Sequence, residues 1–282
     1  MSVPVAETEL LAVAVRAADA AAAQLLAHWH GPLEVQTKST ETDPVSAADL
    51  AAEQAVRRLL AAERPGDAIL GEEGGLTPAA EGSEPTGLRW IVDPLDGTVN
   101  YLYGIPQFAV SVAVGDELGA IAGVVVNPVS AERYWGTRSG PVRAVSAGGA
   151  ATDMTPRGES RLHHALVATG FGYDAGVRAV QGQVVATLLP RVRDIRRAGA
   201  AALDLCAVAS GHVDAYYERG VKPWDIAAGV LFCERAGLVV RPLEAVPAGA
   251  WAPGAPALPA GVIVAPAAFV DELHGLVSGP SR

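Results

Sequence analysis

The chain has 282 residues and carries 31 Asp and Glu against 21 Lys and Arg, a formal net charge of −10. An acidic surface repels the phosphate backbone of nucleic acids, which argues against a general nucleic-acid-binding protein. Its two cysteines are too few for a disulfide framework, which indicates a reducing compartment. The acidic excess keeps such a protein soluble, and part of it can also gather carboxylates that hold cations.

No segment has the pattern of an export signal or a membrane anchor. The first nine residues contain Glu7 and Glu9 but no basic run, so they do not form a secretory signal. The longest uncharged stretch, 245–270, contains prolines that would break a spanning helix, at 247, 253, 256, 259 and 266. We therefore expect a cytoplasmic protein that binds neither membrane nor nucleic acid.

Apolar periodicity and turn residues predict alternating helices and strands along the chain. The expected helices cover residues 6–30, 46–64, 177–189, 200–210 and 224–236. The expected strands cover 68–70, 88–92, 108–114, 120–126, 165–168, 192–196, 213–217 and 261–264. A polar, glycine-rich region at 136–159 separates the two halves. This alternation predicts a layered α/β architecture, with its weakest division near residues 145–160.

The strongest local motif is Trp-Ile-Val-Asp-Pro-Leu-Asp-Gly-Thr at residues 90–98. An apolar strand ends at Asp93, and Asp96 follows within the same turn. Two carboxylates this close are costly unless a cation neutralises them, and hard oxygen ligands on a loop suit Mg²⁺. Gly97 and Thr98 are placed to open a helix whose free N–H groups favour a phosphate. The competing interpretation is an ordinary Asp-rich turn.

Two further acidic motifs occupy similar positions. Glu72 and Glu73 follow an apolar strand and precede glycines, and Asp225 opens an apolar helix. Taken alone, the first pair is typical of a solvated loop, and Asp225 is typical of an acid at a helix N-terminus. Ligands in α/β sheets bind at the carboxyl ends of strands, where two of these motifs lie. Together the three motifs therefore predict one shared metal site.

These motifs resemble those of the inositol monophosphatase family, and the likeness runs in family order from about residue 38 to 237. The matching segments are 38–49, 71–73, 90–101, 169–173, 197–203, 213–218 and 224–229. Residues 191–229 resemble the actinobacterial branch of that family. The resemblance implies a five-layered αβαβα sandwich of the inositol monophosphatase and fructose bisphosphatase type. It implies a single domain, 1–282, with a metal- and phosphate-binding lobe at about 1–150 and a substrate lobe at 151–282, in a homodimer.

The resemblance also implies Mg²⁺-dependent hydrolysis of a small phosphate monoester, with two to three ions per subunit. The expected metal ligands are Glu72, Asp93, the carbonyl of Leu95, Asp96 and Asp225. Glu72 and Thr98 would orient or deprotonate the attacking water, and Asp49 would support them or cap its own helix. The expected substrate contacts are Asp96, Gly97, Thr98, Gly199, Ala200, Ala201, Glu218 and Asp225.

The resemblance implies a small phosphorylated polyol as the substrate. Two departures from the family pattern bear on which polyol it is. Ala200 stands where Ser or Thr is common, so one hydroxyl near the substrate is missing, and residues 136–149 replace the usual Gly-Ala-Phe hairpin. We expect myo-inositol 1-phosphate as substrate. Histidinol phosphate, fructose 1,6-bisphosphate and a 3′-phosphoadenosine nucleotide remain alternatives. A hypothesis of another class is a non-catalytic, metal-bound dimer that acts through protein contacts.

Overall fold

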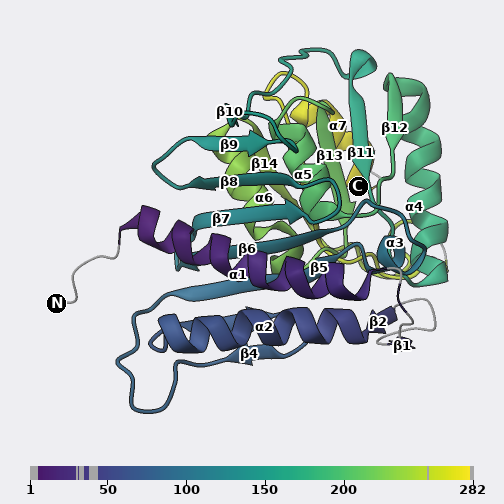
Figure 1. Cartoon of the computed structure of the whole chain (residues 1–282). Coiled ribbons are helices and arrows are strands. Elements are labelled where there is room, and N and C mark those ends of the chain that lie inside the picture. Colours follow the sequence, from purple (N-terminus) through teal and green to yellow (C-terminus); the bar gives the residue numbers. More distant parts are fainter. Residues whose placement is uncertain (1–5, 30, 32–34, 38–43, 253, 280–282) are drawn as a thin grey trace.

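The computed structural model describes residues 6–29, 31, 35–37, 44–252 and 254–279 (Figure 1). Helices and strands alternate through this part of the chain. The α-helices are α1 (Glu7–His28), α2 (Ala47–Glu63), α3 (Thr98–Leu102), α4 (Ala175–Leu188), α5 (Ala201–Ala209), α6 (Pro223–Arg235) and α7 (Val270–Val277). The 3-10 helices are η1 (Leu162–His164) and η2 (Leu189–Arg191).

The first large sheet is built from the N-terminal half of the chain. Its strands are β3 (Ala68–Gly71), β4 (Gly75–Thr77), β5 (Arg89–Asp96), β6 (Ala109–Asp116), β7 (Gly119–Asn127), β8 (Glu132–Thr137), β9 (Val142–Val145) and β10 (Thr152–Asp153). Their order across the sheet is β10-β9-β8-β7-β6-β5-β3-β4. β3 and β5 run parallel, and the other neighbours are antiparallel. The carboxyl ends of β3 and β5 therefore lie side by side.

The second large sheet is built from the C-terminal half. Its strands are β11 (Leu166–Thr169), β12 (Asp194–Arg196), β13 (Ala215–Arg219), β14 (Val239–Leu243) and β15 (Gly261–Ala265). They are ordered β12-β11-β13-β15-β14, with β11 parallel to both β12 and β13 and β15 antiparallel to its neighbours. A small antiparallel pair, β1 (Val35–Thr37) and β2 (Pro44–Ser46), precedes α2.

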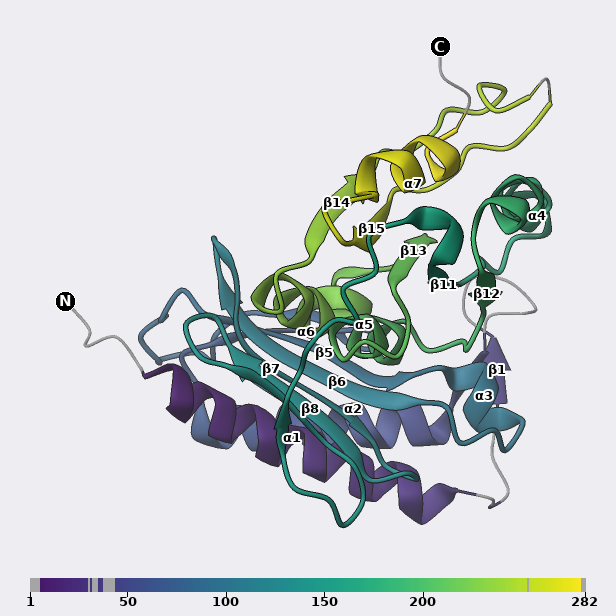
Figure 2. The same ribbon diagram turned by 90° about the horizontal axis from the view of Figure 1, so that it is seen from above.

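The elements stack in five layers, which is clearest in the view from above (Figure 2). α1 and α2 cover one face of the first sheet, and α5 and α6 lie between the two sheets. α4 and α7 cover the outer face of the second sheet. This arrangement confirms the predicted layered α/β fold. The assignment of residues 1–282 to one two-lobed domain stays a prediction from the sequence.

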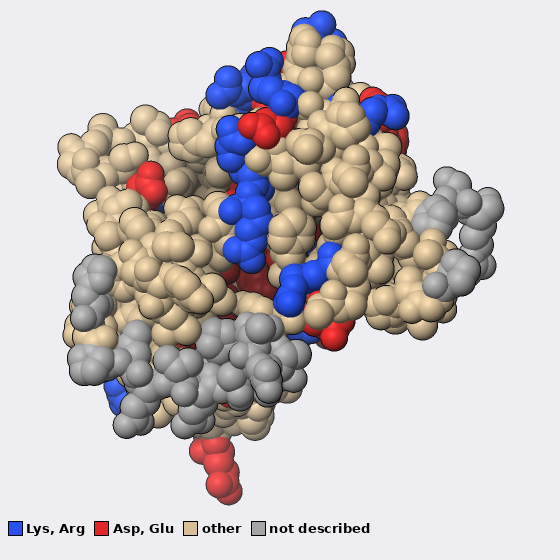
Figure 3. Space-filling model, turned by 90° about the vertical axis from the view of Figure 1, so that its right-hand side faces the viewer, with Lys and Arg blue, Asp and Glu red and all other residues tan. Residues whose placement is uncertain are grey.

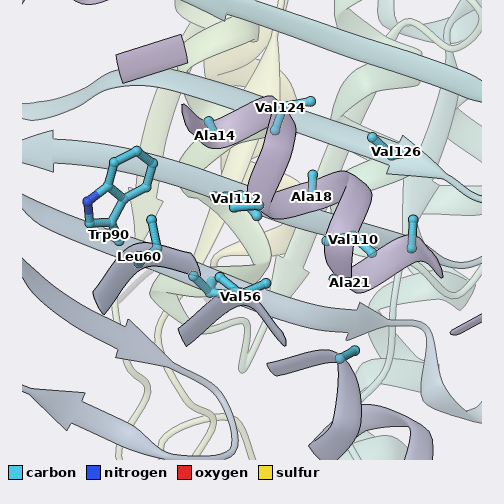
Figure 4. Close-up of a cluster of buried hydrophobic side chains, with 14 of the residues drawn as sticks. Ala14, Ala18, Ala21, Val56, Leu60, Trp90, Val110, Val112, Val124 and Val126 are labelled. Carbon is cyan, nitrogen blue, oxygen red and sulfur yellow. The ribbon is translucent and has the colours of Figure 1, made fainter. Parts of the chain in front are cut away.

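Small side chains let α1 approach the first sheet closely. Ala14, Ala18 and Ala21 are buried on the face of α1 that meets the valines of β6 and β7 (Figure 4). From α2, Val56 and Leu60 join the same cluster. Alanine gives up almost no side-chain entropy on burial and favours helix, so an alanine-rich chain can pack this layer with few aromatic residues.

Within the described part of the chain, α1 has the length and apolar composition of a membrane-spanning helix, with a mean hydropathy of 1.6. Its apolar face is buried against α2, β6 and β7 in this fold. Packing in the core therefore accounts for the hydropathy of α1.

Helix α2 begins where the sequence predicts it, at a capping box. The Ser46 hydroxyl accepts a hydrogen bond from the N–H of Ala48 (3.2 Å), and the Asp49 carboxylate accepts one from the N–H of Ser46 (2.9 Å). These bonds satisfy N–H groups that a helix start leaves open. They also fix the orientation of Asp49, which is fully buried.

The structure contains elements that the sequence analysis did not predict. β8, β9 and β10 form a meander that begins before the predicted polar region at 136–159 and runs through most of it. β4, β14 and α7 were also not expected. The short strands β9 and β10, the last two on this side of the sheet, present mostly exposed or half-exposed residues, so they lack the apolar alternation that signals a strand.

Candidate active site

Strand pairing brings the first two acidic motifs together. Glu72 follows β3 directly, and its N–H donates to the carbonyl of Val92 on β5 (3.1 Å). Asp93 is the next residue of β5 and is buried. The N-terminus of α6, which packs against β5, adds Asp225. The fold thus gathers acids from three separate segments at one edge of the first sheet, as the sequence predicted.

These carboxyl groups interact strongly. Burial raises the pKa of Asp93 well above its usual value, and the charges of Glu72, Asp96 and Asp225 raise it further. Burial likewise raises the pKa of Asp225 to about 6, although bonds from the Lys222 N–H and from Asp93 oppose the shift. Buried like charges of this kind are stable only with shared protons or a bound cation.

The donor set suits a hard divalent cation, because carboxylate oxygens surround it and excess negative charge is buried there. Among the residues that the structure describes, no three such side chains already adopt the arrangement of a metal site. The acids instead bind N–H donors: Asp93 accepts from Leu95 (3.0 Å) and Asp225 accepts from Lys222 (2.6 Å). The assignment of Glu72, Asp93, Leu95, Asp96 and Asp225 as metal ligands stays a prediction.

Asp96 joins the two sheets. The pairing of β5 with β6 shifts register between Asp93 and Asp96, and Asp96 then pairs with Ala109 as the last residue of β5. Its two oxygens accept the N–H groups of Ala201 (3.1 Å) and Ala202 (2.7 Å) at the start of α5. Burial and the charge of Asp225 nevertheless raise its pKa well above the usual value. A predicted metal ligand therefore also caps the helix between the sheets.

The turn after Asp96 presents Thr98. Gly97 adopts φ 93°, a left-handed conformation, and Thr98 begins the short helix α3. The Thr98 hydroxyl lies 3.1 Å from an Asp49 oxygen and 3.2 Å from the Leu95 carbonyl, and it donates to these acceptors. Asp49 thus caps α2 and also accepts the Thr98 hydroxyl, and its part in catalysis stays a prediction.

The second sheet contributes Glu218, near the end of β13. Its Oε2 accepts the hydroxyl of Tyr216 (2.8 Å), and burial raises the pKa of Glu218 to about 7. A Cβ on Gly170 would lie 2.0 Å from the same Oε2, so the segment after β11 packs directly on this carboxyl group. Glu218 and Asp225 lie close enough for the charge of Asp225 to contribute to the shift.

The predicted substrate contacts before α5 lie beside these acids. Ala200 is buried at the N-cap of α5, and Gly199 has φ 92°. A Cβ on Gly97 would meet the carbonyl oxygen of Gly199 at 3.1 Å and the Cβ of Ala200 at 3.3 Å. On the face where α3 lies, a space-filling view shows a hollow with acidic side chains at its floor and basic ones along its rim (Figure 3). Such a hollow combines a cation-binding floor with attraction for an anion.

Comparison with known proteins is consistent with this geometry. The family model for "Inositol monophosphatase family" matches residues 6–274. The chain belongs to the inositol monophosphatase family. It is 44% identical over 211 residues to an inositol-1-monophosphatase SuhB of Mycobacterium tuberculosis, covering 72% of this chain and 70% of the relative. This match to a mycobacterial relative confirms the predicted family and its actinobacterial likeness. Membership of this family makes the chain a phosphatase.

Two further matches extend the comparison. A solved structure, the extragenic suppressor protein suhB of Bartonella henselae, superposes with a TM-score of 0.81 at 31% identity, covering 96% of this chain and all of that one. A protein of Pasteurella multocida named Nus factor SuhB is 36% identical over 236 residues, covering 82% of this chain and 84% of the relative. The fold is thus that of this family. Some of its relatives are named as inositol-1-monophosphatases and others as Nus factors.

Several residues at the site were not singled out by the sequence analysis. The Asn100 side-chain amide donates to the carbonyls of Gln107 (2.6 Å) and Ala198 (2.9 Å), so it ties α3 to the segment before α5. Asp204 on α5 is buried, and burial together with the charge of Glu218 raises its pKa to about 8. The Glu53 carboxylate accepts the backbone N–H groups of Glu73 and Gly74, which follow Glu72. The spacing of Glu53, four residues after Asp49, was the available signal, since it places both on one face of α2.

The turn at Gly97 provides a first test of this geometry. Gly97→Ala should lower the phosphatase rate roughly 10- to 100-fold, because the new Cβ would meet two carbonyl oxygens at 3.1 Å and displace Thr98. The strained φ should also lower the free energy of unfolding by about 1–3 kcal/mol. Initial rates and denaturant unfolding measure both effects.

Gly148→Ala is the matched control. Gly148 also has a positive φ, 69°, but a Cβ added there would meet no atom of the described residues within 4 Å. This variant should lose stability while keeping the wild-type rate. A wild-type rate in Gly97→Ala would contradict the prediction that the turn at Gly97 and Thr98 binds the phosphate group.

Proposed function

We propose that the protein hydrolyses a small phosphate monoester, myo-inositol 1-phosphate in the first instance, with Mg²⁺ as its cofactor. The observation that carries the proposal is the convergence of Glu72, Asp93, Asp96 and Asp225, where burial and then mutual repulsion raise the pKa of three of them. We further propose that it acts in the cytoplasm as a homodimer and binds neither nucleic acid nor membrane.

The residues present suit two to three Mg²⁺ ions held by Glu72, Asp93, the Leu95 carbonyl, Asp96 and Asp225. When bound, such ions supply Lewis-acid charge to phosphoryl oxygens and lower the pKa of water. The cluster has the required hard oxygens, and buried negative charge gives a cation a strong electrostatic reason to bind there.

Thr98 is the residue best placed to orient the attacking water. Its hydroxyl is held between Asp49 and the Leu95 carbonyl, so its lone pairs can accept a hydrogen bond from water while its proton is engaged. Glu72 lies against Asp93 and can receive the proton of that water. The first N–H groups of α3 have no acceptor within the helix and would bind a phosphate oxygen.

Glu218 supports a polyol as the leaving group. A buried carboxyl group whose pKa is about 7 can accept hydrogen bonds from sugar-like hydroxyls, and Arg197 lowers that pKa by its charge. Gly199, Ala200 and Ala201 offer a small-residue surface next to Gly97 and Asp96, but no side-chain hydroxyl. This lack keeps histidinol phosphate, fructose 1,6-bisphosphate and a 3′-phosphoadenosine nucleotide as alternative substrates.

A substrate panel tests the proposal. Phosphate release should require Mg²⁺ and should show its highest kcat/KM with inositol 1-phosphate among the four substrates. The same assay with excess chelator should fall to the background rate. Activity that persists in chelator would refute the metal requirement, and a higher kcat/KM for another substrate would reassign the specificity.

A relative that is 36% identical to this chain is named Nus factor SuhB, and this name favours a second candidate function. That candidate is a metal-bound dimer that acts through protein contacts without catalysis. The complete set of Glu72, Asp93, Asp96, Thr98 and Asp225 supports the enzyme instead. Cells in which Asp93→Asn replaces the wild-type protein separate the two, because full function in those cells would favour the non-catalytic role.

A further inference from the structure

A buried ion pair on α2 lies beneath the loop that carries Glu72. Glu53 is only 3% exposed, and its two oxygens accept the N–H groups of Glu73 and Gly74, each at 2.7 Å. The Arg57 Nε donates to the same carboxylate, also at 2.7 Å. Bonds of this kind between charged groups and N–H donors are short and strong.

The rest of the loop is held by the same pair. A Cβ on Gly71 would lie 2.6 Å from the Glu53 carboxylate, so only glycine lets the backbone approach this closely. Arg57 also donates to the carbonyl of Gly75 (2.8 Å) and to the hydroxyl of Thr77 (2.7 Å). The Glu53–Arg57 pair therefore contacts the chain on both sides of Glu72.

Glu72 needs such support because its neighbours repel it. Burial is the largest cause of the raised pKa of Asp93 and the charge of Glu72 is the next, so two like charges face each other when both groups are ionised. A loop free to move would relieve this repulsion by carrying Glu72 away. The N–H of Glu72 donates to the carbonyl of Val92, and the N–H of Glu73 donates to the carboxylate of Glu53. The backbone of Glu72 is therefore held at both ends.

Helix α2 supports the other half of the site in the same way. Asp49, one turn before Glu53, holds the Thr98 hydroxyl. Val56 and Leu60 of the same helix are fully buried in the core. One rigid helix thus fixes the position of Thr98 through Asp49 and that of the Glu72 loop through Glu53.

We infer that Glu53, oriented by Arg57, is a positioning residue that holds Glu72 where it can bind a divalent cation. Glu53 acts through the backbone N–H groups of residues 73 and 74 and through its close contact with Gly71. The inference rests on the proposed metal-dependent function and assigns a role to a residue outside the ligand set.

The variant Glu53→Gln tests the inference. Glutamine keeps the size of the side chain but has one carboxamide oxygen for the two N–H groups, and its NH₂ would face a donor. We expect the affinity for Mg²⁺, measured by calorimetry on the whole protein, to fall about 10- to 100-fold, as is usual for partners of metal ligands. At saturating Mg²⁺ kcat should return to within about threefold of wild type.

The matched control is Glu63→Gln on the same helix. Glu63 forms a comparable pair with Arg16 (2.6 Å), but it lies at the far end of α2 and is partly exposed. The variant Glu63→Gln should leave the affinity for Mg²⁺ unchanged. Amide hydrogen exchange at residues 73 and 74, measured without metal, should be faster in Glu53→Gln and unchanged in the control.

A second variant, Arg57→Gln, keeps both backbone bonds to Glu53 and should weaken Mg²⁺ binding less than Glu53→Gln does, so the inference does not depend on one variant folding. Wild-type Mg²⁺ affinity in folded Glu53→Gln, despite faster exchange, would overturn it and leave Glu53 a structural anchor. If the wild-type protein itself binds no Mg²⁺, the proposed function fails, and this inference falls with it.

Discussion

Asp93→Asn should lower kcat/KM for phosphate release at least about 100-fold, because it removes the carboxylate at the centre of the proposed cation cluster. Asp93 interacts with Glu72, Asp96 and Asp225 at once, so no neighbour can replace it. Asp225→Asn should have an effect of the same order, since Asp225 is the carboxylate that α6 adds to those at the ends of β3 and β5. Steady-state kinetics at saturating Mg²⁺ measures both.

Asp116→Asn is the control for this experiment. Asp116 is paired with Arg138 (2.7 Å) at the turn between β6 and β7 and contacts none of the predicted ligands. It should keep the wild-type rate. Near-normal turnover in either cluster variant would refute the assignment of the site, provided that thermal unfolding shows both to be folded.

In the absence of Mg²⁺, the stability of the protein should fall as the pH rises from about 5 to 8. The folded-state pKa values of Asp225, Glu218 and Asp204 are raised to about 6, 7 and 8, above those of unfolded carboxyl groups. The folded state therefore holds protons that the unfolded state has lost. A group with a raised pKa favours folding below its unfolded pKa, and that contribution is lost as pH rises through its folded pKa.

Thermal unfolding in chelator at pH 5.5 and pH 8 measures this loss. Mg²⁺ at about 100 times its pH 8 dissociation constant should stabilise the protein by about 2.7 kcal/mol at pH 8, and the same concentration should stabilise it less at pH 5.5. Equal ionic strength from KCl is the control. A melting temperature that rises between pH 5.5 and 8 in chelator would contradict the raised pKa values.

The acidic motifs could be predicted from the sequence because each is local. Asp93 and Glu72 directly follow apolar strands, and parallel pairing of β3 with β5 then brings them together. The layered fold followed from alternating strands and helices in the same way. Both conclusions need only neighbouring residues and the general behaviour of α/β sheets.

Contacts between distant segments could not be predicted. Nothing near Asp96 in sequence indicates that its oxygens bind the N–H groups of Ala201 and Ala202. The spacing of Glu53 from Asp49 places the two on one face of α2, but only the tertiary fold shows that Glu53 is buried against the Glu72 loop. The strands β9 and β10 were missed because sheet edges carry little apolar patterning.

The position of Asp225 in the chain has a consequence for how the protein assembles during synthesis. The first sheet is complete at Asp153, long before α6 has been made, and N-terminal units generally fold first. Glu72, Asp93 and Asp96 therefore take their places without the fourth acid, while Asp96 still lacks the N–H groups of α5. The charge of Asp225, which is the largest charge effect on Asp96, joins the cluster only when α6 packs onto β5. A divalent cation that binds the cluster at that moment would also favour the packing of α6.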